Sequence, residues 1–344
     1  MSSFELSGRP VGLDYPPLVI AEIGINHEGD INKALMMVDA AHASGCECVK
    51  IQSHVVEDEM IPNDVVPGNA KESIWEIMSR CALSEDEELI VKRRIEALGM
   101  LFLSTPFSRA AAERLESMGV AAYKIGSGEC NNYPLVRHIA SYGKPVILST
   151  GMNDITSIGC AVDILREAEI PFALMHCTSM YPTPYDKVRL GALEQLGGAF
   201  PDAVLGLSDH SLGNYTCYAS VPFGARILEK HFTVDKFWPG PDVSISIDPE
   251  ELRQLIEGSR AIHQALGGGK DILPEEQSTI DFAYASVVTT GAVATGEVLS
   301  AQNIWVKRPG LGGIPAKEFE RILGHRAVRP LDKDVQIGWE DIDG

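Results

Sequence analysis

Two histidines, His210 and His231, stand at the polar ends of two short apolar runs, 21 positions apart in the chain. The runs read Ala-Val-Leu-Gly-Leu-Ser-Asp-His over 203–210 and Arg-Ile-Leu-Glu-Lys-His-Phe-Thr over 226–233, and residues 214–224 between them could form a short helix. A strand, a helix and a strand of this length form a βαβ unit, whose two strands run parallel and are often adjacent. Both imidazoles would then emerge at one edge of a sheet, where they could share a divalent metal ion. The alternative is that each is a hydrogen-bonded histidine beside the core.

One rhythm repeats from residue 18 to about residue 233: an apolar or β-branched run ends in polar residues, and a helical pattern follows. The eight runs, which are candidate strands, span residues 18–26, 46–53, 101–106, 122–128, 145–151, 172–179, 204–210 and 227–233. The clearest helical patterns span residues 32–43, 84–98, 109–118, 154–168 and 249–266. Asp30, Ser84 and Ser108 stand where N-caps are needed. Eight parallel strands that alternate with helices predict an α/β fold of the (β/α)8 TIM-barrel class, because the alternative, an open doubly wound sheet, has a dinucleotide glycine fingerprint that this sequence lacks.

Polar residues gather at the carboxyl ends of these runs, where such barrels have their catalytic groups. The candidates are Glu22, Lys50, Gln52, Thr105, Lys124, Ser127, Glu129, Ser149, Gly151, Ser179, Ser208, His210 and His231. Glu22, Lys50 and Lys124 stand among apolar neighbours, where an unpaired charge is expensive to bury. One buried lysine could simply pair with a carboxylate, but two in one ring of strand ends favour neutralisation of an anion. Because hydroxyl groups and glycines suit phosphate, the set indicates phosphoenolpyruvate or a similar small phosphorylated acid.

The composition sets further limits. The chain has 344 residues, of which 45% are apolar and 22% charged, as expected for a soluble globular protein with a sizeable core. A formal net charge of −19 without a basic stripe argues against a nucleic-acid partner. Residues 1–17 show no signal-peptide pattern, and no apolar run approaches the roughly 20 residues of a membrane span. Seven scattered cysteines indicate reduced thiols, so we expect a cytoplasmic protein without a membrane partner.

The chain divides by composition into four parts. They are an N-terminal extension (1–17), the barrel (18–269), a polar linker (270–284) and a small module with short β-type runs (285–344). A module of about 60 residues is small for an independent domain, so we expect it to dock on something. Two long loops, 55–74 and 236–248, follow strands of the barrel and are expected to act as lids or substrate walls.

Read in order, the strand ends and the loops after them form a series of motifs. They are Ala21-Glu-Ile-Gly-Ile-Asn-His-Glu-Gly-Asp30, Val49-Lys-Ile-Gln52, Leu103-Ser-Thr-Pro-Phe107, Tyr123-Lys-Ile-Gly-Ser-Gly-Glu129, Leu148-Ser-Thr-Gly-Met152, His176-Cys-Thr-Ser-Met-Tyr-Pro-Thr-Pro184, Ser208-Asp-His210, Glu229-Lys-His-Phe-Thr233 and Pro239-Gly-Pro-Asp242. This series resembles the sialic acid (N-acetylneuraminate) synthase family of the bacterial NeuB type, which includes legionaminic and pseudaminic acid synthases and spore-coat polysaccharide relatives. The resemblance covers nearly the whole chain. Its last part, through Lys307-Arg-Pro-Gly310, is similar to that family's antifreeze-like (SAF) domain.

The resemblance implies a transferase that uses phosphoenolpyruvate. Phosphoenolpyruvate would condense with the open-chain aldehyde of an N-acylated amino sugar, such as N-acetylmannosamine or a 2,4-diacetamido-trideoxyhexose. The products would be a nonulosonic (sialic-type) acid and phosphate, which leaves by C–O cleavage. The implied cofactor is Mn²⁺ or Mg²⁺, acting as a Lewis acid.

The resemblance also implies roles for matching positions. The carboxylate of phosphoenolpyruvate would be held by Lys50, Thr105, Lys124 and Ser127. Its phosphate would be held by Lys124, Ser149, Gly151, Ser179 and Ser208. The sugar would be positioned by Glu22, Tyr181 and Asp242, with Gln52 as a further substrate contact. The metal ligands would be His210 and His231, Glu129 would act with Lys124 and Glu22 near the reacting centre, and Arg308 of the partner subunit would reach the N-acyl group.

Two positions depart from the family pattern. Ser179 stands where the family often has asparagine, which would shorten a phosphate contact or bridge it by water. Asp242 is followed by Val243, where the family commonly has histidine. The second departure and the loop over 65–73, with Asn69 as a candidate contact, fall where the sugar should bind, so the acceptor sugar stays open.

Two alternatives to this function remain. A phosphoenolpyruvate enzyme of the DAHP or KDO8P synthase type would need basic residues on the active-face loops for a phosphorylated sugar. The loops after the second and eighth strands offer few beyond Lys71 and Lys236. A non-catalytic carbohydrate-binding protein would leave the set of strand-end residues unexplained.

The small C-terminal module would gain stability by docking on the barrel mouth of a second copy, which predicts a domain-swapped homodimer with twofold symmetry.

Overall fold

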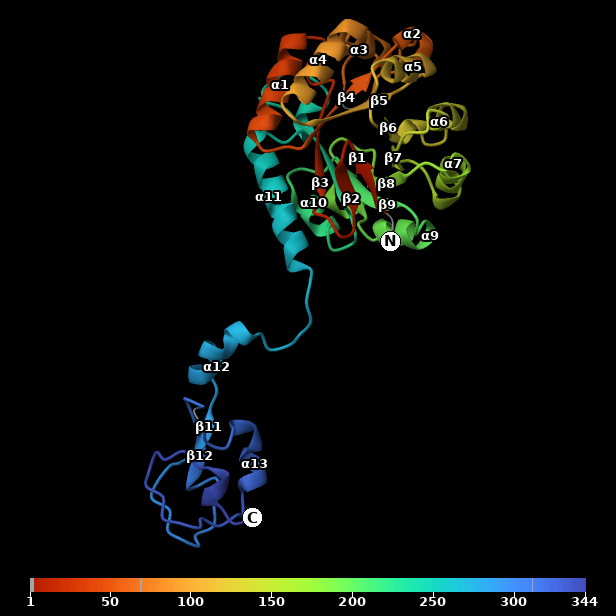
Figure 1. Cartoon of the computed structure of the whole chain (residues 1–344). Helices are drawn as coiled ribbons and strands as arrows, with labels where there is room; N and C mark the ends of the chain where they lie inside the picture. The colour runs from red at the N-terminus through yellow and green to blue at the C-terminus, as the bar shows by residue number, and fades with distance from the viewer. Residues whose placement is uncertain (1–2, 69, 311) are drawn as a thin grey trace. The chain divides into compact units, whose positions relative to one another are not determined.

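A computed structural model of the protein describes residues 3–68, 70–310 and 312–344. The chain divides into two compact units, Met1–Gly267 and Gly268–Gly344. In Figure 1 the first unit runs from red to cyan and the second is blue.

The first unit is built on one sheet of eight parallel strands (Figure 1). The strands are β3 (Leu18–Gly24), β4 (Cys48–Ser53), β5 (Leu101–Pro106), β6 (Tyr123–Ile125), β7 (Val146–Ser149), β8 (Phe172–Cys177), β9 (Val204–Asp209) and β10 (Ile227–His231). Their order is β5-β4-β3-β10-β9-β8-β7-β6, and the two end strands, β5 and β6, also lie against one another. This is a nearly closed barrel, which confirms the predicted (β/α)8 fold and all eight candidate strands.

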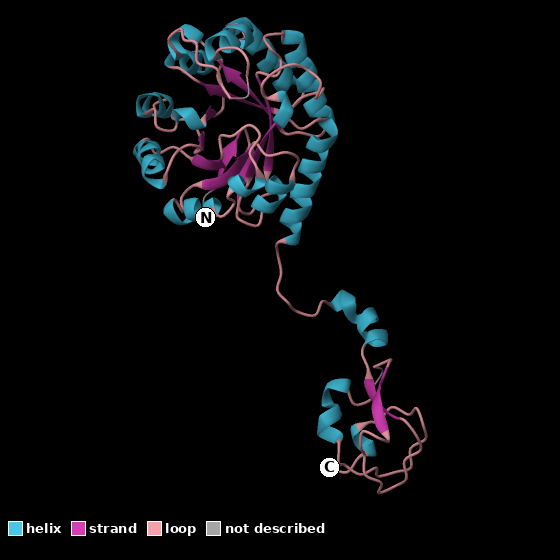
Figure 2. Ribbon diagram, turned by 180° about the vertical axis from the view of Figure 1, so that it is seen from behind, coloured by secondary structure: helices cyan, strands magenta, loops and turns pink. Residues whose placement is uncertain are grey.

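Helices cover the outside of the sheet, as Figure 2 shows. The main ones are α1 (Ile31–Ala43), α4 (Glu85–Ala97), α5 (Arg109–Ser117), α6 (Tyr133–Ala140), α7 (Ile155–Glu167), α9 (Ala192–Ala199), α10 (Tyr215–Ser220) and α11 (Pro249–Ala265). The side chains of Asp30, Ser84 and Ser108 accept hydrogen bonds from backbone N–H groups at the starts of α1, α4 and α5, as predicted. The apolar faces of these helices form one continuous core with the outward-facing strand residues.

The predicted N-terminal extension forms a hairpin of two strands, β1 (Ser3–Leu6) and β2 (Arg9–Gly12). Its buried Phe4, Leu6 and Val11 belong to one apolar cluster with residues near the starts of the barrel strands, such as Leu18. The hairpin therefore closes the amino-terminal end of the barrel and leaves the carboxyl ends of the strands for chemistry.

The segment expected to be one loop, 55–74, contains a short helix, α2 (Val56–Glu59), and leads directly into α3 (Ile74–Cys81). Ser73 and Glu76 form a reciprocal capping box that begins α3. The segment expected to be a long loop therefore holds one short helix, α2, and ends where the Ser73–Glu76 capping box begins α3.

The second unit is small and rich in turns, with α12 (Gln277–Ala283), the antiparallel pair β11 (Ser286–Thr289) and β12 (Ile304–Lys307), and α13 (Phe319–Ile322). Its own core includes Val287, Ile304 and Ile337. Part of the predicted linker, residues 270–284, is thus helical. Among the described residues, no helix combines the length and the apolar character needed to cross a membrane.

Candidate active site

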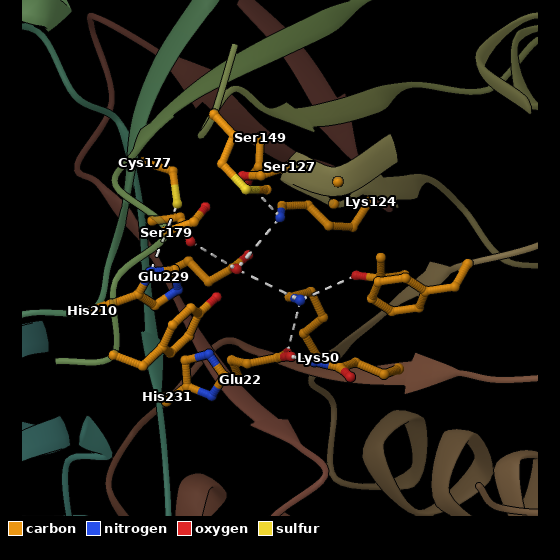
Figure 3. Close-up of a pocket in the computed structure, with 18 residues that line it drawn as sticks. Glu22, Lys50, Lys124, Ser127, Ser149, Cys177, Ser179, His210, Glu229 and His231 are labelled. Atoms are coloured by element: carbon orange, nitrogen blue, oxygen red, sulfur yellow. Dashed lines mark hydrogen bonds and ion pairs between the residues drawn. The ribbon is translucent and has the colours of Figure 1, made fainter. Parts of the chain in front are cut away.

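A cavity of about 310 Å³ opens at the carboxyl ends of the barrel strands (Figure 3). Its lining includes the predicted residues Glu22, Lys50, Gln52, Thr105, Lys124, Ser127, Ser149, Ser179, Tyr181, Ser208, His210 and His231. Strand register explains why they meet: His231 lies opposite Glu22, and Glu22 lies opposite Lys50. Parallel pairing places these three side chains at one level across three adjacent strands.

Glu229 lies at the centre of this cavity, between the two lysines (Figure 3). Its Oε1 atom is 3.5 Å from Lys50 Nζ, 3.4 Å from Lys124 Nζ and 3.2 Å from Ser208 Oγ. Burial alone would raise the pKa of Glu229, but the two ammonium groups outweigh it and lower that pKa to about 2. The carboxylate therefore stays ionised and holds two buried lysines in one place.

The two lysines differ in their remaining partners. Lys50 Nζ is 2.9 Å from Glu22 Oε2 and donates to Thr105 Oγ1 at 3.1 Å, whereas Lys124 Nζ donates to Ser149 Oγ at 2.7 Å. Burial opposes the charge of both, but Glu22 and Glu229 raise the pKa of Lys50, while the pKa of Lys124 is lowered. Contacts of 3.4–3.5 Å to Glu229 are longer than the roughly 2.8 Å of a strong charged hydrogen bond, so both ammonium groups keep donor capacity for an anion.

A group of hydroxyl and backbone donors lies beside Lys124. Gly151 N–H donates to Ser127 Oγ at 3.0 Å, and Asn153 donates to the backbone oxygens of Ser127 and Gly151. A Cβ atom at position 151 would meet Ser179 Oγ at 2.5 Å and Ser127 Oγ at 2.8 Å, so a side chain here would displace these two hydroxyls. Close backbone approach with several donors is the arrangement that suits a phosphate group.

The two imidazoles of His210 and His231 lie with their ring centroids 5.4 Å apart. His210 Nδ1 lies 3.0 Å from the backbone oxygen of Thr178, and the ring of Tyr181 stacks on His210 at 4.2 Å. Burial, and then the charge of His210, keep the pKa of His231 well below its usual range, so His231 is a neutral imidazole. Both imidazoles face the cavity, as predicted from the βαβ unit.

We tested whether these groups suit a divalent metal ion. His231 Nδ1 is buried and makes no hydrogen bond to a described residue, and the nearest carboxylate atom is Asp242 Oδ2 at 3.8 Å. Within the described residues, no three His, Cys, Asp or Glu side chains form a ready metal cage. Two imidazoles and a nearby carboxylate are nevertheless ligand types that Mn²⁺ accepts, and such a set leaves positions for substrate and water. The residues fit an open metal site.

Some predicted residues lie outside the cavity lining. Glu129 lies in a neighbouring hollow of about 330 Å³, where its carboxylate accepts from Asn132 at 2.6 Å and burial raises its pKa. Asp242 is half-buried beside His231, and loss of solvent around its carboxyl raises its pKa to about 6. Arg308 belongs to the second unit, and its side chain is exposed. Asn69 lies outside the described residues.

Glu229 is a cavity residue that was not predicted to be functional. The sequence does contain a signal for this position. Strand residues two apart face the same side, and Glu229 precedes His231 by two positions, so both side chains face the cavity. Cys177 and Phe107 also line the cavity and were not predicted. Their apolar or weakly polar side chains gave no signal that distinguishes them from core residues.

Two further histidines near the site, His176 and His27, have structural roles. His176 Nε2 is 2.6 Å from the backbone oxygen of Val188, and His27 Nδ1 accepts from the N–H of Gly29 at 3.1 Å. Burial lowers the pKa of His27 to about 4, so that ring is neutral. Each ring fixes a loop rather than facing the cavity.

Fold and site together define a nearly closed (β/α)8 barrel with a lysine- and hydroxyl-lined cavity, followed by a small β-containing unit. A model of the NeuB family matches residues 37–271, and a model of the SAF domain matches residues 284–343. The chain belongs to the NeuB family, which confirms the resemblance found in the sequence.

Named relatives agree with this assignment. The N,N'-diacetyllegionaminic acid synthase of Legionella pneumophila is 34% identical over 97% of both chains. The spore coat polysaccharide biosynthesis protein SpsE of Bacillus subtilis is 34% identical over 99% of this chain and 98% of its own. The solved structure of N-acetylneuraminic acid (sialic acid) synthetase from Leptospira borgpetersenii, in complex with citrate, has a TM-score of 0.75 and 33% identity over 81% of this chain and 95% of that one. This chain is therefore similar to sugar-acid synthases along most of its length.

Proposed function

We propose that this protein condenses phosphoenolpyruvate with the open-chain aldehyde of an N-acylated amino sugar, giving a nonulosonic acid and phosphate. The observation that carries the proposal is the pair of buried lysines around Glu229, which faces hydroxyl donors on one side and two imidazoles on the other. The similarity of the chain to a legionaminic acid synthase and a sialic acid synthetase supports the same reaction.

In the proposed reaction, Lys50, Thr105, Lys124 and Ser127 hold the carboxylate of phosphoenolpyruvate. Ser149, Gly151, Ser179 and Ser208 hold its phosphate together with Lys124. The fixed ammonium groups stabilise negative charge without reorganising, because their partners already hold them in place. Carbon 3 of phosphoenolpyruvate bonds to the aldehyde carbon, water adds to carbon 2, and the bond from carbon 2 to the phosphate oxygen breaks.

His210 and His231 would hold the metal ion, Mn²⁺ or Mg²⁺. When bound, the ion would supply Lewis-acid polarisation of the aldehyde oxygen. Glu22 and Tyr181 both line the cavity and would orient the sugar, with Asp242 beside His231. Glu129 lies in the neighbouring hollow rather than in this cavity, so the proposed reaction gives it no step.

The acceptor is proposed to be an unphosphorylated sugar. Lys236, the basic residue of the loop after β10, is already paired with Glu251 and lies 3.8 Å from Asp248. A phosphorylated acceptor of the DAHP or KDO8P type would require free cations at this end of the cavity. The pairing of Lys236 therefore favours a neutral N-acylated sugar.

Phosphate release tests the proposed function. The purified protein would be assayed with phosphoenolpyruvate, Mn²⁺ and, in turn, N-acetylmannosamine, 2,4-diacetamido-trideoxyhexoses, arabinose 5-phosphate and erythrose 4-phosphate. We expect release with an N-acylated sugar and none with the phosphorylated ones. Release only with a phosphorylated sugar would favour the DAHP or KDO8P type, and no release with any sugar would favour a carbohydrate-binding protein.

We further propose a homodimer in which the second unit of one subunit completes the site of the other. Large apolar side chains are exposed in the loops after barrel strands (Met152 and Phe237) and at the start of α10 (Tyr215), and the second unit exposes Trp305 and Trp339. Exposed apolar groups of this size are typical of surfaces that become covered in an assembly.

Complementation tests this exchange. His231→Ala and Arg308→Ala should each be inactive, but mixed dimers should recover activity, because one of their two sites has both intact residues. With random mixing, about a quarter of all sites would be intact in a twofold dimer. Mixed dimers that stay inactive would show that Arg308 acts within its own subunit, and an active Arg308→Ala variant would show that it does not act in the reaction.

A further inference from the structure

A second buried network leads from the cavity to the neighbouring hollow, through four side chains that are all hydrogen-bonded in series. Gln52 Nε2 donates to Glu22 Oε1 at 2.9 Å, and Gln52 Oε1 lies 3.0 Å from His54 Nε2. His54 Nδ1 lies 2.7 Å from Glu59 Oε2. Since Glu22 also contacts Lys50, the network connects Glu59 with a substrate-facing residue.

The direction of each hydrogen bond in this series is fixed by chemistry. Lys50, at 2.9 Å, keeps Glu22 a carboxylate, so Glu22 Oε1 requires a donor and the N–H₂ group of Gln52 must face it. Gln52 then presents its oxygen to His54, which must donate from Nε2. The other ring nitrogen of His54 faces a carboxylate oxygen of Glu59, which is also an acceptor. Both ring nitrogens of His54 therefore face acceptors.

We propose that His54 and Glu59 form a positioning pair that holds one extra proton and thereby fixes the amide of Gln52 against Glu22. Because imidazole is a stronger base than a carboxylate, the proton belongs to His54, and Glu59 is its counter-ion. The consequence for sugar binding rests on the proposed function, whereas the protonation of the pair does not.

The surroundings of His54 provide the rigidity that such a pair needs. The ring is 4% exposed and stacks on Phe107 at a centroid distance of 4.6 Å and an interplanar angle of 13°. Glu59 ends α2, and that helix is anchored separately by Asp58, whose Oδ2 accepts from Ala110 N–H at 2.8 Å. The pair therefore fixes both the amide of Gln52 and the aromatic wall that Phe107 places between the cavity and the hollow.

The other ionisable groups around His54 are already committed. Glu88, on α4, accepts from Ser53 Oγ and is paired with Arg114 Nη1 at 2.7 Å. His27, on the loop after β3, is neutral because burial lowers its pKa to about 4. Glu59 is thus the carboxylate in direct contact with His54 among the described residues.

The proton count on His54 tests the proposal without any substrate. Protein labelled with ¹⁵N-histidine would be studied by nuclear magnetic resonance at neutral pH, with His54→Gln to assign the ring signals. We expect hydrogen on both ring nitrogens in the wild type and in the matched control Glu57→Gln, which removes an exposed carboxylate from the same helix. In Glu59→Gln we expect hydrogen on Nε2 alone, because the new amide can donate to Nδ1. A wild-type ring with one hydrogen would overturn the proposal.

The side-chain amide of Gln52 supplies the second readout. In Glu59→Leu the ring of His54 loses its partner at Nδ1 and is free to turn away from Gln52, so the N–H₂ signal of Gln52 should shift and lose protection from hydrogen exchange. Glu59→Gln should keep the wild-type signal of Gln52 and its protection, because the new amide still holds Nδ1 of His54. An unchanged Gln52 signal in Glu59→Leu would refute the positioning role, since it would show that Gln52 does not need the pair.

In the phosphate-release assay with the acceptor sugar, Glu59→Leu should raise KM for the sugar about tenfold and change kcat little. An effect of this size is typical when a residue that orients a ligand-binding side chain is removed. Glu59→Gln should stay near the wild type. If the two spectroscopic results hold but no sugar is turned over by the wild type, the proposed function fails and the positioning pair stands.

Discussion

The two faces of strand β10 carry two buried charge networks that differ in how completely they are satisfied. Lys230 faces the helices, where it is fully buried and contacts Asp209 Oδ2 at 2.6 Å. Asp209 also accepts from the hydroxyls of Thr216 and Ser211 and from the N–H of Ser211. Strong, short contacts surround every charge in this outer network, as structural ion pairs require.

On the inner face, Glu229 and His231 face the cavity. Glu229 contacts its lysines only at 3.4–3.5 Å, and neither Glu229 Oε2 nor His231 Nδ1 hydrogen-bonds to a described residue. Buried polar groups normally find partners, so these open positions next to a cavity indicate where a ligand completes the network. Burial of charge by itself does not distinguish a structural site from a functional one, but incomplete satisfaction does.

The largest expected effect is on the inner face. His231→Ala should reduce phosphate release to the background rate, and excess Mn²⁺ should not restore it, because the remaining imidazole cannot hold the ion alone. His42→Ala, an exposed position on α1, serves as the control and should keep full activity. Near-normal turnover by His231→Ala would contradict the metal assignment.

On the outer face, Asp209→Asn should lower the free energy of unfolding by about 4 kcal/mol, because it leaves the Lys230 ammonium buried without a counter-ion. Urea unfolding measures this change, and phosphoenolpyruvate should stabilise the variant no more than it stabilises the wild type. The double variant Asp209→Asn, Lys230→Met should recover much of the loss. If the free energy of unfolding fell by less than about 1 kcal/mol, the Asp209–Lys230 pair would not be a buried ion pair that the fold requires.

Glu229→Gln makes the corresponding change on the inner face. We expect a loss of about 3 kcal/mol without ligand, because two buried lysines lose a shared carboxylate. Phosphoenolpyruvate should restore more stability here than in the wild type, because its anionic groups replace the missing charge. If ligand rescue were equal in Glu229→Gln and Asp209→Asn, the distinction between the two faces would fail.

His27 gives a smaller, pH-dependent effect. Its pKa falls from 6.5 to about 4 in the folded protein because burial disfavours the charged ring. As the pH falls, the unfolded chain therefore takes up a proton on His27 before the folded protein does. The free energy of unfolding is at its full value above pH 6.5 and decreases as the pH falls toward about 4, by at most about 3 kcal/mol. Urea unfolding of the wild type and of His27→Gln across this range measures the difference. If the free energies of unfolding of the two proteins changed with pH in the same way, His27 would not be the cause of the pH dependence.

Much of this fold could be predicted because its signals are local. Each barrel strand is a short apolar run, and caps such as Ser84 and Ser108 mark where helices begin. The N-terminal hairpin could not be predicted in the same way, because Phe4 and Val11 are buried only by the barrel floor they cover. Helix α3 was missed although Ser73 and Glu76 form a capping box that the sequence displays.

The site was predicted less evenly. Side chains at strand ends, such as Lys50 and Lys124, stood out because they are charged within apolar runs. Glu229 was overlooked because it lies between a run and two other polar residues, and only the alternation of strand faces separates it from Lys230. The distance from Glu129 to the cavity depends on the turn after β6 and on Phe107, and neither follows from residue spacing.

Calorimetric titration with phosphoenolpyruvate tests the central claim most directly, namely that the unsatisfied lysine cluster of the cavity binds this anion. We predict binding to the wild type and to Lys92→Met, a control that removes a lysine paired with Glu96 on α4. In Lys124→Met, the loss of one charged hydrogen-bond donor should weaken binding about 10- to 100-fold. Equal affinity of Lys124→Met and the wild type would contradict the claim.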